Sequence, residues 1–188
     1  MSKLFWICVV VCTYGVVLAL RVTPERFYVE YYNSDYIRYM NVSVRRLSRH
    51  SPYTFNVDFD ALYYFGNNVT LKIEVYEEVS GRYIPIPIVV EKKLCDFLQN
   101  DQLFGQKWFK EISSDQICPF KSGEHKFRNI NVNLDDFPFE IPFTWSSFMA
   151  KIRVDITAFL TEQADVRLSI WKQFYNIVRK PKGQTKSG

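Results

Sequence analysis

The chain has 188 residues with a formal net charge of +4, and 47% of its residues are hydrophobic. Four of its cations lie among the last ten residues with no acid beside them. Without these four and Lys3 the net charge is −1, so the folded body lacks the basic face that nucleic-acid binding requires. The length is sufficient for one domain with a full hydrophobic core.

The first 19 residues predict a cleaved secretory signal. Lys3 precedes an apolar run over residues 4–20, and Val17 and Ala19 have the small-residue spacing that signal peptidase accepts. An uncleaved membrane anchor is the alternative, because the run approaches the length of a membrane span. Polar residues within the run, and the lack of a cationic cluster after it, favour cleavage after Ala19 and export of the protein.

Runs of alternating polar and apolar residues dominate the rest of the chain. They predict antiparallel strands with one buried face and one wet face. The strongest runs are 54–62, 69–79, 151–160 and 164–174. In the first of them, Asn56, Asp58 and Asp60 should lie on the wet face. In the last, Val166, Leu168 and Ile170 should face inward, opposite Arg167, Ser169 and Trp171.

Weaker strand patterns occupy residues 26–32, 39–47, 82–94 and 126–134. Pro85 and Pro87 would restrict the third of these to a sheet edge or leave it a loop, because proline cannot donate a ladder hydrogen bond. Glycine- and asparagine-containing turns separate the runs. About eight short strands with such turns predict an antiparallel sandwich or barrel.

One segment breaks the strand period and predicts a helix within residues 96–113. Its apolar residues recur at three- and four-residue steps: Leu94, Phe97, Leu98, Phe104, Trp108 and Ile112. Cys95 and Cys118 flank this segment and are the pair left after signal cleavage. In an exported chain such a pair predicts one disulfide, which would stabilise the fold by about 3 kcal/mol.

Further signals agree with export. Asn41 and Asn68 each begin an Asn-x-Ser/Thr triplet, which predicts glycosylation at the protein surface. Residues 179–188 carry no apolar side chain to bury, so they predict a basic, disordered tail after a domain that spans 20–178.

The sequence indicates neither a catalytic site nor a metal site. It has two histidines, no Cys-x-x-Cys pair and no Gly-x-Ser-x-Gly motif, so neither a zinc site nor a hydrolytic triad is indicated. The Lys-Ser-Gly at 121–123 lacks the preceding glycines of a phosphate loop. We therefore predict no catalytic residue, no metal and no cofactor.

Three segments resemble a known family pattern: "LCDFLQND" from residue 94, "ICPFKSG" from residue 117 and "FPFEIPFTW" from residue 137. The pattern is that of a large insect family of small secreted proteins. That family is similar to the chemosensory B proteins and, more distantly, to the ganglioside activator and the myeloid-differentiation-type lipid-recognition superfamily. The resemblance covers about residues 69–160, and its main elements are Cys95, Phe97, Leu98, Cys118, Pro119, Lys121, Gly123, Asn129, Pro138 and Pro142.

The resemblance implies an all-β, antiparallel, immunoglobulin-like sandwich with one short helix and an apolar cavity between the sheets. It implies a secreted, non-enzymatic binder of a lipid or other hydrophobic small molecule, in chemosensation or pheromone response. The alternating strand faces would supply the cavity lining, with two helical residues at its rim. The candidates are Phe55, Val57, Phe59, Leu71, Ile73, Val75, Ile152, Val154 and Ile156, with Phe104 and Trp108 at the rim.

Two alternatives stay open at this point. Aromatic side chains, 17% of the chain, line ligand pockets but also simply fill cores. A filled core would favour a recognition module for an extracellular protein or receptor. Exposed rings in the tyrosine-rich segment 26–40 would support that second function, namely Tyr28, Tyr31, Tyr32, Tyr36 and Tyr39.

Within 117–129, Pro119, Gly123 and His125 are interpreted as a disulfide corner followed by a strand, with positive φ at Gly123.

Overall fold

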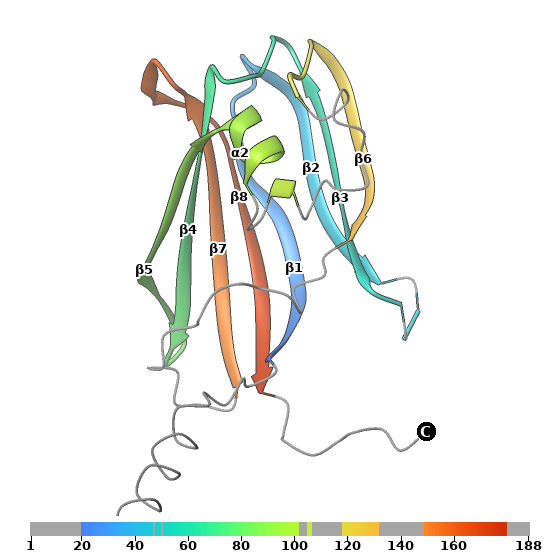
Figure 1. Cartoon of the computed structure of the whole chain (residues 1–188), viewed down its shortest axis with the longest axis vertical. Coiled ribbons are helices and arrows are strands. Elements are labelled where there is room, and N and C mark those ends of the chain that lie inside the picture. Colours follow the sequence, from blue (N-terminus) through green and yellow to red (C-terminus); the bar gives the residue numbers. More distant parts are fainter. Residues whose placement is uncertain are drawn as a thin grey trace, which may run out of the picture.

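The computed structural model describes residues 20–46, 48–49, 51–101, 105–106, 118–131 and 149–179. Two antiparallel sheets and a short helix make up the described fold, which confirms the all-β sandwich (Figure 1). The five-stranded sheet has the order β1 (Leu20–Tyr32), β8 (Gln163–Arg179), β7 (Met149–Leu160), β4 (Val69–Val79) and β5 (Arg82–Lys93). The three-stranded sheet has the order β2 (Ile37–Arg46), β3 (Tyr53–Ala61) and β6 (Gly123–Asn131). The predicted signal and the tail beyond Arg179 lie outside the described residues.

The two sheets meet along one side and splay apart on the other. Strands β1 and β2, consecutive in the chain, are edge strands of different sheets and contact each other. The opposite edges are β5 and β6. The helix α2 (Leu94–Asn100) lies between the sheets at one end of the sandwich (Figure 1). The interior therefore has a joined side at β1 and β2 and a side that α2 helps to close.

The predicted inward faces of β3, β4 and β7 are confirmed, since the apolar residues that the alternation directs inward are all buried: Phe55, Val57, Phe59, Val69, Leu71, Ile73, Val75, Ile152, Val154, Ile156 and Ala158. The predicted wet face of β3 is only partly correct, because Asn56 and Asp58 are also buried. Strand β3 lies between β2 and β6, and side chains from the neighbouring strands cover it. Arg128 of β6 pairs with Asp58 at 2.5 Å, and the Asn129 amide donates to Asn56 Oδ1 at 2.9 Å. Hydrogen bonding thus permits burial of two polar side chains.

The predicted faces of β8 are wrong beyond Leu168. The pairing with β7 shifts between Ala158, which pairs with Ser169, and Phe159, which pairs with Arg167. Leu168 is the extra residue of this bulge, and it is buried together with Ser169. Because a bulge shifts the alternation by one residue, Ser169 and Trp171 turn to the interior instead of Ile170.

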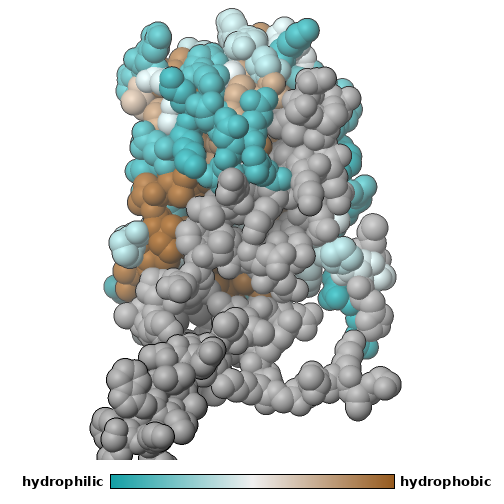
Figure 2. Space-filling view, in the orientation of Figure 1, coloured by the Kyte–Doolittle hydropathy of each residue, from teal (hydrophilic) through white to brown (hydrophobic). Residues whose placement is uncertain are grey.

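Strand β5 is an edge strand, as its two prolines predict. Apolar side chains gather along this edge of the molecule, where Ile84 and Val89 are about half exposed (Figure 2). An exposed apolar edge invites pairing with other chains. Pro85 and Pro87 counter this tendency, because neither can donate a backbone hydrogen bond.

The helix begins two residues before the predicted span and ends at Asn100. Asn67, from the loop before β4, caps its start, since Asn67 Oδ1 accepts hydrogen bonds from the amides of Cys95 and Asp96. At its end Asp101 is extended and buried, and it pairs with Lys92 at 2.5 Å. Residues 105–106 are again helical, and the remainder of the predicted helix lies outside the described residues. No helix within the described ranges is both long and apolar enough to cross a membrane.

The predicted disulfide between Cys95 and Cys118 is confirmed, with its Cα atoms 5.4 Å apart. It joins the first turn of α2 to the corner that precedes β6. At this corner the Cys118–Pro119 peptide is cis, and Gly123 has the predicted positive φ of 124°. Phe65 and Phe120 exchange two backbone hydrogen bonds, of 2.9 and 2.8 Å, and attach the corner to the loop after β3.

Loss of the disulfide should lower stability substantially. In the chain-entropy model, a bridge across a sequence separation of 23 residues stabilises the fold by about 3 kcal/mol. We expect the variant Cys95→Ala/Cys118→Ala to lose about that much unfolding free energy in a denaturant titration. Reduced wild-type protein, which retains both sulfur atoms, is the control. Identical unfolding midpoints for oxidised and reduced protein would contradict the prediction.

Candidate ligand pocket between the two sheets

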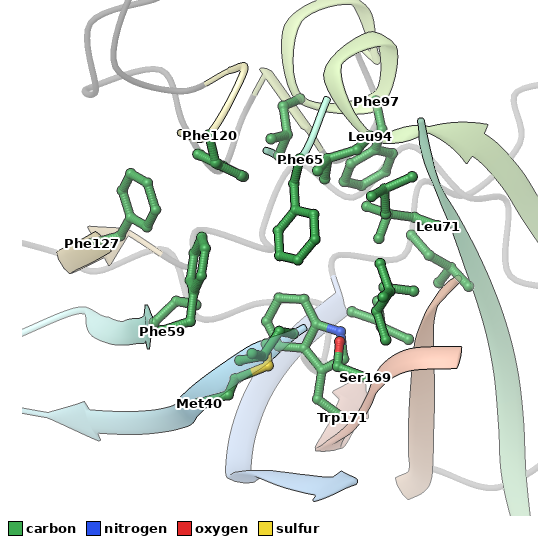
Figure 3. Close-up of a pocket in the computed structure, with 18 of the residues that line it drawn as sticks. Met40, Phe59, Phe65, Leu71, Leu94, Phe97, Phe120, Phe127, Ser169 and Trp171 are labelled. Atoms are coloured by element: carbon green, nitrogen blue, oxygen red, sulfur yellow. The ribbon is translucent and has the colours of Figure 1, made fainter. Parts of the chain in front are cut away.

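An apolar pocket of about 90 Å³ lies between the sheets at the α2 end (Figure 3). Among the described residues that line it, all except Ser169 have apolar or aromatic side chains. The five-stranded sheet contributes Val69, Leu71, Ile73, Ile156, Ala158, Leu168, Ser169 and Trp171. The three-stranded sheet contributes Ile37, Met40, Phe55, Val57, Phe59 and Phe127, and the helix and corners contribute Phe65, Leu94, Phe97, Leu98 and Phe120.

Aromatic rings form one wall of this pocket. The rings of Phe59 and Phe120 meet edge-on, with centroids 5.2 Å apart, and Phe127 lies 5.7 Å from Phe120. Phe65 points from the adjacent loop toward Trp171 on the opposite sheet (Figure 3). Because ring packing of this kind is favourable in itself, the wall is held in place without a ligand.

Six of the eleven predicted cavity residues line the pocket: Phe55, Val57, Phe59, Leu71, Ile73 and Ile156. Val75, Ile152 and Val154 are buried but do not line it. They lie farther along β4 and β7, away from the end of β4 that pairs with the residues just before α2. Phe104 and Trp108 lie outside the described residues.

Sequence reasoning missed other lining residues for identifiable reasons. Phe65 and Phe120 lie in irregular segments, where no period indicates a direction for the side chain. Leu94, Phe97 and Leu98 have the helical spacing of a buried stripe, which identifies core residues but not a pocket. The alternating pattern places Trp171 on the wrong face of its strand, and only the bulge in β8 explains its true direction.

The inner face of β8 also places polar groups in the interior. Tyr175 and Gln173 are almost fully buried, and the tyrosine hydroxyl donates to Gln173 Oε1 at 2.6 Å. Burial raises the pKa of Tyr175 above its ordinary range, so this hydroxyl remains protonated. Ser169 and Trp171 precede this pair on the same face, at the pocket itself.

His125 belongs to the structural corner. Its Nε2–H donates to the carbonyl oxygen of Lys121 at 2.7 Å, and its ring stacks on Phe59 with centroids 5.0 Å apart. It packs against the aromatic wall without lining the pocket. This arrangement agrees with the interpretation of 117–129 as a corner and a strand.

The two predicted glycosylation sites differ in structure. Asn41 is exposed on strand β2. Asn68 is exposed too, but its side chain organises the preceding loop. Its Oδ1 accepts from the Gly66 amide at 2.7 Å, and its Nδ2 donates to the carbonyl of Tyr64 at 3.2 Å. A glycan on Asn68 would have to accommodate these contacts.

Tyrosines form a second notable feature, on the surface. Tyr28, Tyr31, Tyr32 and Tyr39 are 37–47% exposed, whereas Tyr36 is half-buried against Tyr63 with ring centroids 5.5 Å apart. The first three of them line an open groove between the edge strands β1 and β2.

No protein-family model and no curated protein matches this chain. Within the described ranges, no group of three or more His, Cys, Asp or Glu side chains is placed to bind a metal ion. The structural basis for a function is therefore the geometry of the pocket and of the exposed tyrosines.

The buried pair of Tyr175 and Gln173 gives a test of the polar interior. Tyr175→Phe leaves Gln173 Oε1 buried without this donor, which should cost about 1–3 kcal/mol of unfolding free energy in a urea titration. The double variant Tyr175→Phe/Gln173→Leu removes both partners and should recover much of that loss. Equal losses in the single and double variants would show that the hydrogen bond does not explain the effect.

Proposed function

We propose that this protein is a secreted, non-enzymatic binder that encloses a lipid chain or another hydrophobic small molecule. The observation that carries the proposal is the pocket between the sheets, whose described lining is apolar except for Ser169 and the indole nitrogen of Trp171. Concave apolar sites with few polar groups are the usual form of small-molecule sites. The disulfide is compatible with an oxidising, extracellular setting.

The size of the pocket limits what it holds. Ligand sites for drug-sized molecules typically have volumes of about 300–1,000 Å³. A volume of about 90 Å³ suits a compact molecule or one segment of an alkyl chain. A longer ligand would need the sheets to separate further.

An empty pocket of this kind has an energetic cost. At about 24 cal/mol per Å³, a void of about 90 Å³ lowers stability by about 2 kcal/mol. Occupation by an apolar ligand would remove this loss. The resemblance to the chemosensory B proteins supports a role in taste or pheromone detection, with a hydrophobic signal molecule as the ligand.

Filling the pocket should weaken ligand binding. Ala158 lines the pocket and Thr157 precedes it on the same strand, with its side chain on the other sheet face. We expect Ala158→Leu to lower the affinity for a neutral, fluorescent apolar probe by about tenfold or more, and Thr157→Leu to leave that affinity unchanged. Probe titration measures both variants, and circular dichroism verifies that they fold.

Native mass spectrometry of protein secreted from eukaryotic cells, followed by organic extraction, would identify a resident ligand. Wild-type protein that carries no extractable lipid and takes up no probe would contradict the proposal.

The exposed tyrosines favour a second function, recognition of an extracellular protein or receptor. Tyrosine is enriched at binding hot spots, because it buries a large rigid ring and offers a hydroxyl group. Tyr31 and Tyr32 line the groove between β1 and β2. Tyr63 and Tyr64, which are 57% and 55% exposed, lie outside it.

If this second function is correct, substitution of the groove tyrosines should weaken partner binding, and substitution of the tyrosines outside the groove should not. Tyr31→Ser/Tyr32→Ser should weaken binding to a partner found by extracellular proximity labelling by about 30-fold, the usual loss at a hot spot. Tyr63→Ser/Tyr64→Ser is the matched control and should leave binding intact. Equal behaviour of the two double variants would count against recognition through the groove.

A further inference from the structure

The indole N–H of Trp171 is a buried donor for which the described residues provide no acceptor. Trp171 lines the pocket, and its Nε1 atom has no hydrogen-bond partner in the described part of the chain. Figure 3 shows the indole ring and the Ser169 side chain on the pocket wall that faces Phe65. Buried donors in proteins are almost always bonded, so this one needs an explanation.

The fold places this donor in the pocket through a specific local feature. The bulge at Leu168 turns both Ser169 and Trp171 inward, opposite Ala158 and Ile156 of β7. A regular strand would have directed the same two side chains to the outer face. The bulge therefore brings the indole N–H and a hydroxyl group into a wall whose other described residues are apolar.

Water is a poor partner for this donor. A buried water molecule normally makes two to four hydrogen bonds to polar groups. Among the described lining residues, only Ser169 and Trp171 have side chains able to form hydrogen bonds of ordinary strength. A water molecule here would form hydrogen bonds only with the wall that carries Ser169 and Trp171. A ligand oxygen could therefore displace it at little cost in free energy.

A charged head group is also a poor partner. No Lys, Arg or His is found among the described residues that line the pocket. A carboxylate buried without a cation carries a large desolvation cost. His125 packs against the aromatic wall, but its Nε2–H already donates to the carbonyl oxygen of Lys121.

We propose that Trp171 donates a hydrogen bond to a neutral oxygen of the ligand, so that the pocket selects apolar molecules with a ketone, aldehyde, ester or hydroxyl group. The inference rests on the proposed ligand-binding function and specifies its substrate class. Ser169 contributes a second hydrogen-bonding group on the same wall. A pure hydrocarbon leaves the indole N–H unpaired, and a fatty-acid anion brings an uncompensated charge.

Three probes of equal chain length test this selectivity: methyl pentyl ketone, heptane and heptanoate. Their affinities are measured by competition against a fluorescent apolar probe. We expect wild-type protein to bind the ketone about tenfold more tightly than either other probe, the ratio that one buried hydrogen bond supplies. Trp171→Phe retains an aromatic ring and should abolish the preference for the ketone over heptane. Ile73→Val removes one methyl group from the apolar wall, and it should weaken the binding of the ketone and of heptane to the same extent.

Nitrogen–proton correlation NMR of the indole groups provides a second measurement that does not depend on the folding of a variant. The ketone should shift one indole resonance downfield, and Trp171→Phe assigns that resonance by its disappearance. Equal affinities for ketone and heptane, with no indole shift, would overturn this inference and leave apolar ligand binding intact. Failure of wild-type protein to bind any of the three probes would overturn both.

Discussion

The separation of the two sheets depends on one covalent link at their open side. Strands β1 and β2 join the sheets along one edge, but β5 and β6 at the other edges have no such contact between them. The Cys95–Cys118 disulfide spans this side, because Cys95 follows β5 and Cys118 precedes β6. It fixes α2 between the sheets, where Leu94, Phe97 and Leu98 close the end of the pocket.

Weaker contacts reinforce the same link. Asn67 caps the start of α2, and the backbone pair of Phe65 and Phe120 attaches the corner to the loop after β3. These contacts connect elements that are distant in sequence, so they form only in the folded state. A sandwich closed in this way can keep an internal space instead of collapsing onto it, because both sides of the space are held.

The same apolar side chains can either fill a core completely or leave a pocket, and a small displacement of these side chains separates the two cases. Alternating apolar strands bury their side chains in either case. What distinguishes them here is the position of α2, whose apolar residues meet the ends of the strands rather than their centres. The farther part of the interior, around Val75, Ile152 and Val154, is packed as an ordinary core. The pocket and the packed part of the core thus occupy different lengths of the same strands.

The sequence by itself determined the fold class, the inward faces of β3, β4 and β7, the disulfide, the edge position of β5 and the turn at Gly123. These features follow from local periods, proline and glycine chemistry and the count of cysteines, which act over short distances in the chain. It also supplied six of the lining residues, all of which lie on strands β3, β4 and β7.

Only the tertiary structure decided where the pocket lies and what polar groups it holds. The register shift between β7 and β8 sets the direction of Trp171, and it arises from pairing between separate strands. Phe65 and Phe120 reach the pocket because two irregular segments pair with each other. Such contacts are non-local, so no pattern within a short window of residues specifies them.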